Sequence, residues 1–338
     1  LWTEVKQRHL ARLRLDWSSL QPPPTVTAEG HLYARDLDLL GPHSLLHLLD
    51  TAASAQGRAR LASWLLTQPP SESSWTERRR LIRELTRLTL FRDRLSVQAR
   101  LLGDEELNGQ RLTAVIQHQL HVPHLHIVLP IQALLAATTL LLGLASLLQW
   151  LPGYWMISFG LYALIVFQTD QGEELLEHAV GLHHEVEKLG VVLRYLETQA
   201  RRPDSAIGTA CRSLTESDTA PSAVIRHLAW ALHGASVKAH PLIHLALNAL
   251  CPWDLFFTFR LQQFQRRLHS LLPRWLDCLA EVEAASSVAT FASLHPEYTW
   301  PSLRTEPGIR ASQLGHPLIP SASRIANDFT ISGLGTIH

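Results

Sequence analysis

The feature that most restricts the fold is a stretch without charge, because residues 112–169 contain no Asp, Glu, Lys or Arg. Within it, Ile127 to Leu148 (IVLPIQALLAATTLLLGLASLL) is long enough to cross a bilayer, which takes about 20 apolar residues. The residues from Gln149 to Trp155 predict a tight turn with interfacial aromatic side chains. A second run, Met156 to Phe167, is shorter. We therefore expect a helical hairpin in the membrane; the alternative is a hydrophobic helix pair buried in a dimer core.

The charges beside this stretch predict its orientation. Four arginines precede it, namely Arg92, Arg94, Arg100 and Arg111, whereas the expected turn is uncharged. The positive-inside rule then places both flanking regions in the cytoplasm. The stretch is also internal and too long for a signal peptide.

The cysteines indicate the redox state of the compartment, whereas the overall charge does not identify a binding partner. The three cysteines, Cys211, Cys251 and Cys278, are far apart and odd in number, which argues against a disulfide framework and favours a reducing cytoplasm. The 30 basic and 30 acidic side chains cancel, so whole-chain charge argues neither for nor against nucleic acid. Residues 78–100 hold eight arginines and two acids. This segment could face phosphates, or be a solvated helix face or a cytoplasmic flank of the hairpin.

The rest of the chain up to residue 300 has helical patterning. A short amphipathic helix opens the chain and is ended by Gln21 to Pro24, since proline disfavours helix at and before its position. Ser44 can open another short helix. Further helices are expected at Ala53–Leu66, Ser74–Leu102, Ala223–His233, Pro241–Leu250, Trp253–Leu271 and Trp275–Phe291.

A charged helix is expected from Glu173 to Gln199, directly after the hairpin. Its apolar residues step alternately by four and three, at Leu175, Ala179, Leu182, Val186, Leu189, Leu193 and Leu196. Such a step marks a seam of the coiled-coil type. The seam could pack against neighbours in the same chain or form an intermolecular coiled coil.

The last forty residues change character. Four prolines interrupt them, and short β-branched, alternating pieces follow at Arg324–Ala326, Phe329–Ile331 and Thr336–His338. These pieces predict strands. A helical protein that changes to strands near its end is entering a new domain.

Histidine and glycine patterns do not predict a catalytic or metal site. The 19 histidines make accidental spacings common, as at His240/His244 and among His118, His121, His124 and His126. A metal site needs a third ligand, and neither group has an obvious carboxylate nearby. No G-x-S-x-G elbow and no G-x-x-x-x-G-K-[ST] phosphate loop is present.

Several motifs in one order resemble the MutS mismatch-repair family. Near the end come CLAEVEAASSVAT from Cys278 to Thr290, YTWP at 298–301, PGIR at 307–310, GHPL at 315–318 and AND at 326–328. Near the start, Asp36 to Gly41 and Thr51 to Leu65 (TAASAQGRARLASWL) are similar to the core of that family. The match covers roughly residues 31–110 and 170–338.

The resemblance implies a mainly α fold with five parts. These are an N-terminal helix and Pro-rich linker (1–30), a MutS-like helical core (31–111), the transmembrane hairpin (112–169), the second core and lever part (170–297), and the start of an α/β P-loop ATPase domain (298–338). The final strand, Gly335 to His338, looks like the one that feeds the phosphate loop.

The resemblance also implies ATP as the cofactor, with Mg²⁺ held by residues beyond His338. The residues that would contribute to the nucleotide pocket are Arg324, Ile325, Asn327 and His316; Arg324 stands where the family often has an aromatic residue. The implied partners are DNA, the membrane and a second copy of the chain. The implied location is the bacterial inner membrane.

Two features separate the chain from mismatch-reading members of the family. No F-x-E wedge occurs, and the sequence before residue 31 is too short for a mismatch-binding domain. The hairpin stands where the family has long lever helices and a DNA clamp. Two other interpretations remain open: a membrane-anchored ATPase scaffold that does not act on DNA, and a purely structural membrane coiled-coil protein.

Overall fold

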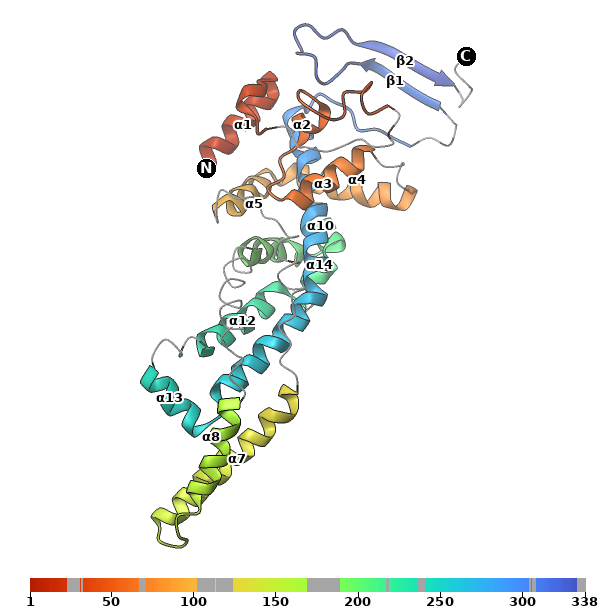
Figure 1. The fold of residues 1–338 in the computed structure, drawn as a ribbon. Helices are drawn as coiled ribbons and strands as arrows, with labels where there is room; N and C mark the ends of the chain where they lie inside the picture. Colours follow the sequence, from red (N-terminus) through yellow and green to blue (C-terminus); the bar gives the residue numbers. More distant parts are fainter. Residues whose placement is uncertain are drawn as a thin grey trace. The chain divides into compact units, whose positions relative to one another are not determined.

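The computed structural model describes residues 1–22, 31, 33–66, 71–101, 113, 124–168, 189–216, 219–235, 237, 241–303, 305 and 308–332. These residues are mainly helical, as the sequence predicts, and they contain one two-stranded sheet (Figure 1). The chain divides into two compact units. Unit 1 comprises Leu1–Asn108, Gln199–Cys211 and Asp277–His338, and unit 2 comprises Gly109–Thr198 and Arg212–Leu276.

Unit 1 is built from short helices whose starts are set by serines. Ser44 caps α2 by accepting the His47 N–H at 3.2 Å, and Ser71 caps α4 by accepting the Ser74 N–H at 3.3 Å. Each hydroxyl satisfies one of the amides that a helix start leaves unpaired. The helices are α1 (Trp2–Arg14), η1 (Trp17–Ser19), α2 (Leu45–Leu49), α3 (Ala55–Leu66), α4 (Glu72–Arg87), α5 (Thr89–Leu101) and α10 (Ala206–Ala210).

The single helix predicted for Ser74–Leu102 is wrong, because the chain breaks at Leu88 between α4 and α5. Leu88 leaves the helical region with φ −97° and ψ 53°. The guanidinium of the buried Arg92 donates to the Leu85 carbonyl oxygen and, at 2.8 Å, to Ser293 Oγ. This tertiary contact supplies a partner for a carbonyl near the break, which periodicity alone does not reveal.

The core of unit 1 joins segments that are far apart in sequence. Leu46 and Leu49 of α2 pack with Leu61 and Ala62 of α3 and with Ala284 of α14. Trp64 and Phe291 are among the partly buried side chains that extend this cluster. The helix that carries the CLAEVEAASSVAT motif therefore packs on the helix that carries TAASAQGRARLASWL.

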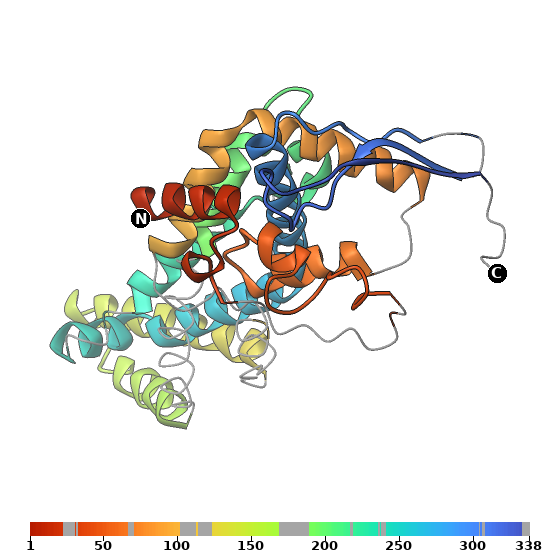
Figure 2. The same cartoon turned by 90° about the horizontal axis from the view of Figure 1, so that it is seen from above.

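The sheet of unit 1 is an antiparallel ribbon of β1 (Gly308–Leu314) and β2 (Asn327–Ser332), seen from above in Figure 2. The expected strand at Phe329–Ile331 is confirmed within β2, whereas Arg324–Ala326 is not a strand and β1 was not predicted. The register shifts between Ala311 and Leu314, where Gln313 has a φ of 53° and donates its N–H to Asp328 Oδ1 at 2.9 Å. The strand expected at Thr336–His338 lies outside the described residues.

Unit 2 contains the expected hairpin of two helices. α7 (Leu125–Leu147) and α8 (Trp155–Gln168) lie side by side, joined by a short turn (Figure 1). The expected bounds are right to within two residues, and Pro130 is accommodated near the start of α7. The remaining helices are residues 189–200, α11 (Arg212–Thr215), α12 (Pro221–Ala235), α13 (Pro241–Leu250) and the first part of α14.

The longest helix, α14 (Trp253–Leu294), has 42 residues and was expected as two helices. Pro273 lies inside it, although a proline in a helix interior costs about 3 kcal/mol. Its ring is exposed, while Leu272 and Trp275 on either side are almost fully buried. Packing of these neighbours offsets the lost hydrogen bond, so the predicted break is wrong.

The described part of the predicted seam packs within the chain. Leu189, Leu193 and Leu196 are buried, and a β-carbon at Gly190 would lie 2.6 Å from Ile225 Cδ1 of α12. Glu197 accepts hydrogen bonds from the Ser222 N–H at 3.1 Å and the Ser222 hydroxyl at 2.9 Å, which caps the start of α12. The earlier seam positions, from Leu175 to Val186, lie outside the described residues.

The expectation that the cysteines stay unpaired is wrong. Cys211 and Cys278 are joined by a disulfide within unit 1, across 67 residues of sequence, and Cys251 is free. Both bonded cysteines are buried. The pairing arises from packing of the α10 end on α14, which no local spacing indicates, and it removes the cysteine argument for a reducing compartment.

Candidate functional site

In the hairpin, several polar and small side chains are buried, whereas many large apolar side chains are exposed. Gln132 and Ala136 of α7 are buried, and Thr139, one turn further on, is half-buried. On α8, Tyr162 is buried and Ser158 is half-buried. Thr139 and Ser158 therefore meet between the two helices, and Gln132, Ala136 and Tyr162 are shielded from the surroundings.

Many large apolar side chains of both helices and of the turn between them are exposed. Leu134 is 69% exposed and Leu141 is 68% exposed, near the middle of α7. The others are Ile127, Ile131, Leu140, Leu144, Leu147, Leu148, Trp150, Leu151, Tyr154, Trp155, Met156, Ile157, Phe159, Leu161 and Leu164. Among the described residues, α7 is the single helix that is by itself long and apolar enough to cross a membrane.

Polar groups of the hairpin are largely satisfied internally. Thr139 Oγ1 donates to the Leu135 carbonyl oxygen and contacts Ser158 Oγ across the helix pair, both at 2.8 Å. Thr138 Oγ1 likewise donates to the Leu134 carbonyl oxygen at 2.8 Å. Gln132 is the exception, since neither of its amide atoms has a partner among the described residues. Such internal pairing is what an apolar solvent demands.

Beside the hairpin, α13 extends the exposed apolar surface of unit 2. The Tyr162 hydroxyl of α8 donates to the Asn248 carbonyl oxygen of α13. Leu242 is 84% exposed and Leu245 is 69% exposed, and α13 carries no Asp, Glu, Lys or Arg. The α13 and α14 axes differ by 87°, so α13 does not extend α14 as a straight span.

The histidine in α13 has a carboxylate partner that the sequence analysis missed. His244 Nε2 lies 2.7 Å from Asp254 Oδ2, and Asn248 Nδ2 donates to the same oxygen at 2.7 Å. The Asp254 N–H donates to Asn248 Oδ1 at 3.1 Å, so the cluster caps the start of α14. No group of three metal-ligating side chains occurs among the described residues; His118, His121 and His240 lie outside them.

Two of the predicted nucleotide residues, His316 and Arg324, lie close to the same glycine. Arg324 lies across Gly315, where a β-carbon would be 2.7 Å from Arg324 Cδ. Its guanidinium stacks 5.3 Å from the Tyr298 ring centre and donates to the Tyr298 hydroxyl. His316, next to Gly315, accepts the Leu318 N–H on Nδ1 at 3.4 Å. The YTWP and GHPL motifs thus meet through Arg324.

The other two predicted residues, Ile325 and Asn327, lie in different environments from His316 and Arg324. Ile325 is 80% exposed, and Asn327 opens β2 opposite Leu314. An exposed apolar side chain fits contact with a base. The guanidinium of Arg324 is already engaged by Tyr298, so it does not fit a stacking role. These four residues therefore fit, at most, the base side of a nucleotide pocket.

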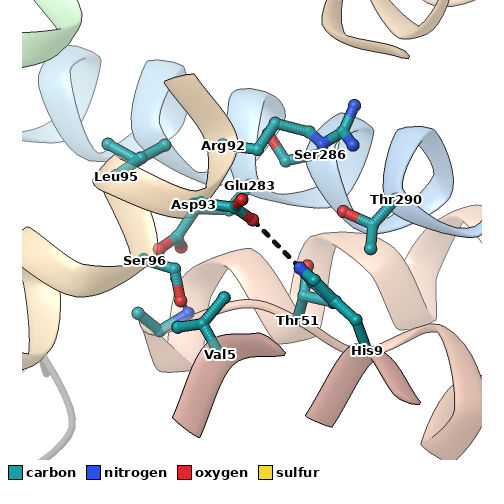
Figure 3. Close-up of a pocket in the computed structure, with 11 residues that line it drawn as sticks. Val5, His9, Thr51, Arg92, Asp93, Leu95, Ser96, Glu283, Ser286 and Thr290 are labelled. Atoms are coloured by element: carbon teal, nitrogen blue, oxygen red, sulfur yellow. Dashed lines mark hydrogen bonds and ion pairs between the residues drawn. The ribbon is translucent and has the colours of Figure 1, made fainter. Parts of the chain in front are cut away.

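A buried polar cluster in unit 1 lies around a small cavity (Figure 3). His9 Nε2 of α1 donates to Asp93 Oδ1 of α5 at 2.9 Å, and Lys6 Nζ donates to Asp93 Oδ2 at 2.5 Å. Glu283 of α14 accepts the Ala53 N–H at 3.2 Å and also accepts the Ser54 hydroxyl proton. The cluster ties α1, α5 and α14 to the segment that precedes α3.

Burial shifts the pKa of several groups in this cluster. Burial raises the pKa of Glu283 to about 7, and its two hydrogen bonds only partly oppose the rise. Burial lowers the pKa of Arg92 to about 10, so Arg92 stays charged at neutral pH. Burial also tends to raise the pKa of Asp93, but hydrogen bonds from His9 and Lys6 bring it below its usual range.

The cavity itself is too small for a substrate. Its volume is about 30 Å³, the room of one or two water molecules. Three buried polar atoms of its lining residues, His9 Nδ1, Arg92 Nε and Ser286 Oγ, have no partner among the described residues and could bind such a water. The cluster is therefore a polar part of the core that connects its helices, and we call it the polar joint. Its sequence signal is Glu283, the second of the two glutamates in the CLAEVEAASSVAT motif, between Val282 and Ala284.

No protein-family model, no curated protein and no solved structure matches this chain.

Proposed function

We propose that this chain is the membrane-anchored core of a MutS-like ATPase, with the α7–α8 hairpin as its anchor. One observation carries the proposal: the hairpin turns polar side chains such as Gln132 and Thr139 inward and leucines such as Leu134 and Leu141 outward. Burying one such leucine is worth about 1.5–3 kcal/mol. A bilayer removes all of the outward leucines from water at once.

A membrane fits this surface better than a dimer core. Exposed apolar side chains occur along both helices and at the turn between them, where Trp150 and Tyr154 are also exposed. Aromatic side chains at one end of an apolar hairpin suit the bilayer interface. In a dimer, the second copy of the chain would have to cover the exposed apolar side chains on all sides of the hairpin.

The attachment is tested by flotation of the expressed chain with liposomes and by carbonate washing of membranes. The expected result is that the chain floats with neutral lipid and resists carbonate. A chain that remains in the soluble fraction as a defined dimer would contradict the anchor and support the dimer-core alternative.

Orientation follows from the arginines that precede the hairpin, and we propose that both flanks are cytoplasmic in a bacterial inner membrane. The buried Cys211–Cys278 disulfide is uncommon in a reducing compartment, so its state in cells tests this placement. Because both cysteines are buried, cells are quenched in acid, the protein is denatured, and its free thiols are counted by maleimide alkylation before and after reduction. Three labelled thiols before reduction would agree with a cytoplasmic flank; one would indicate an oxidising compartment.

The ATPase part of the proposal is supported by the order of the motifs and by their packing. The helices with the TAASAQGRARLASWL and CLAEVEAASSVAT motifs pack together, and Arg324 links the YTWP and GHPL motifs. When bound, ATP would supply the free energy for domain movement, and Ile325 would contact its base.

The test of this part begins with the reading frame beyond His338. A G-x-x-x-x-G-K-[ST] loop within about ten residues is expected, followed by ATP hydrolysis by the complete protein. Dimerisation of that protein with ATP is measured by mass photometry. A frame that continues without the loop would remove the ATPase proposal and leave the anchor intact.

A second candidate is a membrane-anchored ATPase scaffold that does not act on DNA. The observation in its favour is that the hairpin occupies the chain position where the family has its DNA clamp. A salt titration of DNA binding by the complete protein separates the two. Phosphate contacts make the logarithm of affinity fall steeply with the logarithm of salt, whereas a scaffold shows weak binding without such a slope.

A further inference from the structure

Unit 1 carries a cationic groove along α4. The groove has a volume of about 510 Å³, and its lining includes Arg79, Arg80, Arg83 and Arg87 together with Trp75 and Glu84. None of these residues belongs to the hairpin or to the predicted nucleotide pocket. The volume is large enough for a ligand of the size of a nucleotide.

The charges of the groove are not balanced within it. Arg79, Arg83 and Arg87 follow one another at four-residue steps, so they form one stripe along the helix. Like charges at this spacing destabilise a helix. Glu84 is the one acid in the lining, and it is engaged elsewhere. Its carboxylate accepts the Ser205 hydroxyl at 2.8 Å and the Ala206 N–H at the start of α10.

Aromatic rings hold two of the guanidinium groups. Arg79 lies over the Trp75 ring at 4.9 Å, and Arg83 lies over the Trp300 ring at 5.2 Å. Stacking of this kind fixes the plane of a guanidinium and leaves its N–H edge available. Arg79 Nε is buried, and it has no hydrogen-bond partner among the described residues. The site therefore has preorganised donors and an unpaired buried one.

We propose that this groove binds the phosphodiester backbone of a single-stranded nucleic acid. Successive arginines of the stripe are about 6 Å apart along the helix axis, a spacing similar to that of phosphates in an extended strand. Trp75 and Trp300 beside the stripe each have one ring face covered by a guanidinium, and a base can stack on the opposite face. A concave, aromatic-flanked groove suits a strand better than the flat surface of an anionic membrane. The inference does not depend on ATP binding.

The test uses the complete chain in nanodiscs of neutral phosphatidylcholine, with anisotropy of a labelled oligo-dT across a salt series. The double variant Arg83→Gln/Arg87→Gln is expected to weaken binding at least tenfold at low salt. It should also reduce the salt slope by about 1.4, because each single-strand phosphate contact contributes about 0.7. The conservative variant Arg83→Lys/Arg87→Lys should retain most of the slope.

The matched control is Arg266→Gln/Arg267→Gln, which removes two exposed arginines from α14 in unit 2. It should leave the salt slope unchanged, and circular dichroism should show that all variants are folded. Equal binding by the groove variant and the wild type would overturn the proposal. So would unchanged oligonucleotide binding with reduced binding to phosphatidylglycerol nanodiscs, since the groove would then face lipid headgroups.

Discussion

The polar joint of unit 1 and the hairpin of unit 2 distribute polarity in opposite ways. In unit 1, Asp93 and Glu283 are buried and hydrogen-bonded, whereas Arg80 and Arg83 of α4 line a groove at the surface. In the hairpin, the exposed surface is mainly apolar, and the polar side chain of Gln132 is buried. Under the proposed membrane anchor, one chain is folded for two solvents, with water around unit 1 and lipid around α7 and α8.

The largest effect is expected from charges on the outward face of α7. Leu134→Arg together with Leu141→Arg should abolish stable membrane insertion, because each arginine at the centre of a span costs about 2.5–3.5 kcal/mol on insertion scales. Carbonate extraction and flotation measure the loss. Leu90→Arg is the control, since Leu90 is 76% exposed on α5 and should tolerate the same change. Retention of the double variant in the membrane would mean that this face does not meet lipid.

The buried acid of unit 1 predicts a stability change with pH. The pKa of Glu283 is about 7 in the folded chain, above its ordinary value of 4.5. The folded state therefore binds more protons between these values, and its stability falls as pH rises from about 4.5 to 7. The expected loss is about 2–3 kcal/mol, with little further change above pH 7.

Chemical unfolding of the wild type and of Glu283→Gln, each at pH 5 and at pH 8, measures this contribution. The variant should lose less stability than the wild type, because its neutral amide cannot ionise. Asp93 contributes in a more acidic range, since its pKa lies below its usual value. Equal pH dependence in the two proteins would show that Glu283 does not titrate in this range.

The next effect tests how tightly α3 packs on α14. A β-carbon at Gly57 would lie 2.7 Å from Glu283 Cβ and would also clash with its carboxylate. Gly57→Ala should therefore destabilise unit 1 by about 1–3 kcal/mol, although alanine favours helices. Thermal unfolding measures the change. Gly143→Ala adds the same methyl group where nothing lies within 4 Å, and it should be neutral or slightly stabilising. If Gly57→Ala unfolded at a higher temperature than the wild type, α3 and α14 would have to move apart at little cost.

The hairpin and unit 1 also differ in how far the sequence predicts them. The bounds of α7 and α8 follow from a long apolar run, which is a local property. The polar joint depends on contacts between distant residues: Glu283 meets Ala53 and Ser54 across about 230 residues. The break at Leu88 and the Cys211–Cys278 pair depend on similar contacts. Periodicity contains no information about such partners.

The nucleotide residues illustrate a second limit. The motifs indicate His316 and Arg324 as neighbours of one pocket, and both residues do lie beside Gly315. The contact between Arg324 and Tyr298 could not be predicted from spacing, because it depends on how the segment between the strands folds back. Their role toward ATP remains a prediction.

The smallest expected effect concerns α13 of unit 2, which combines features of both regions. It is apolar like the hairpin, yet it holds the polar His244–Asp254–Asn248 cluster that caps α14. We expect α13 to lie in the membrane interface, with Leu242 and Leu245 toward lipid. Replacing both by serine should lower the affinity of the chain for lipid only slightly, because the hairpin still inserts.

A local probe is therefore required to detect this change. Trp253 is the first residue of α14, separated from the end of α13 by two residues, and its Nε1 donates to the Gly234 carbonyl oxygen at 2.9 Å. With the other tryptophans replaced by phenylalanine, quenching of Trp253 by brominated lipid should fall in Leu242→Ser/Leu245→Ser. The same pair of substitutions at Leu10 and Leu13, exposed on α1 in unit 1, is the control and should leave quenching unchanged. Absence of quenching in the parent chain would place α13 in water and confine lipid contact to the hairpin.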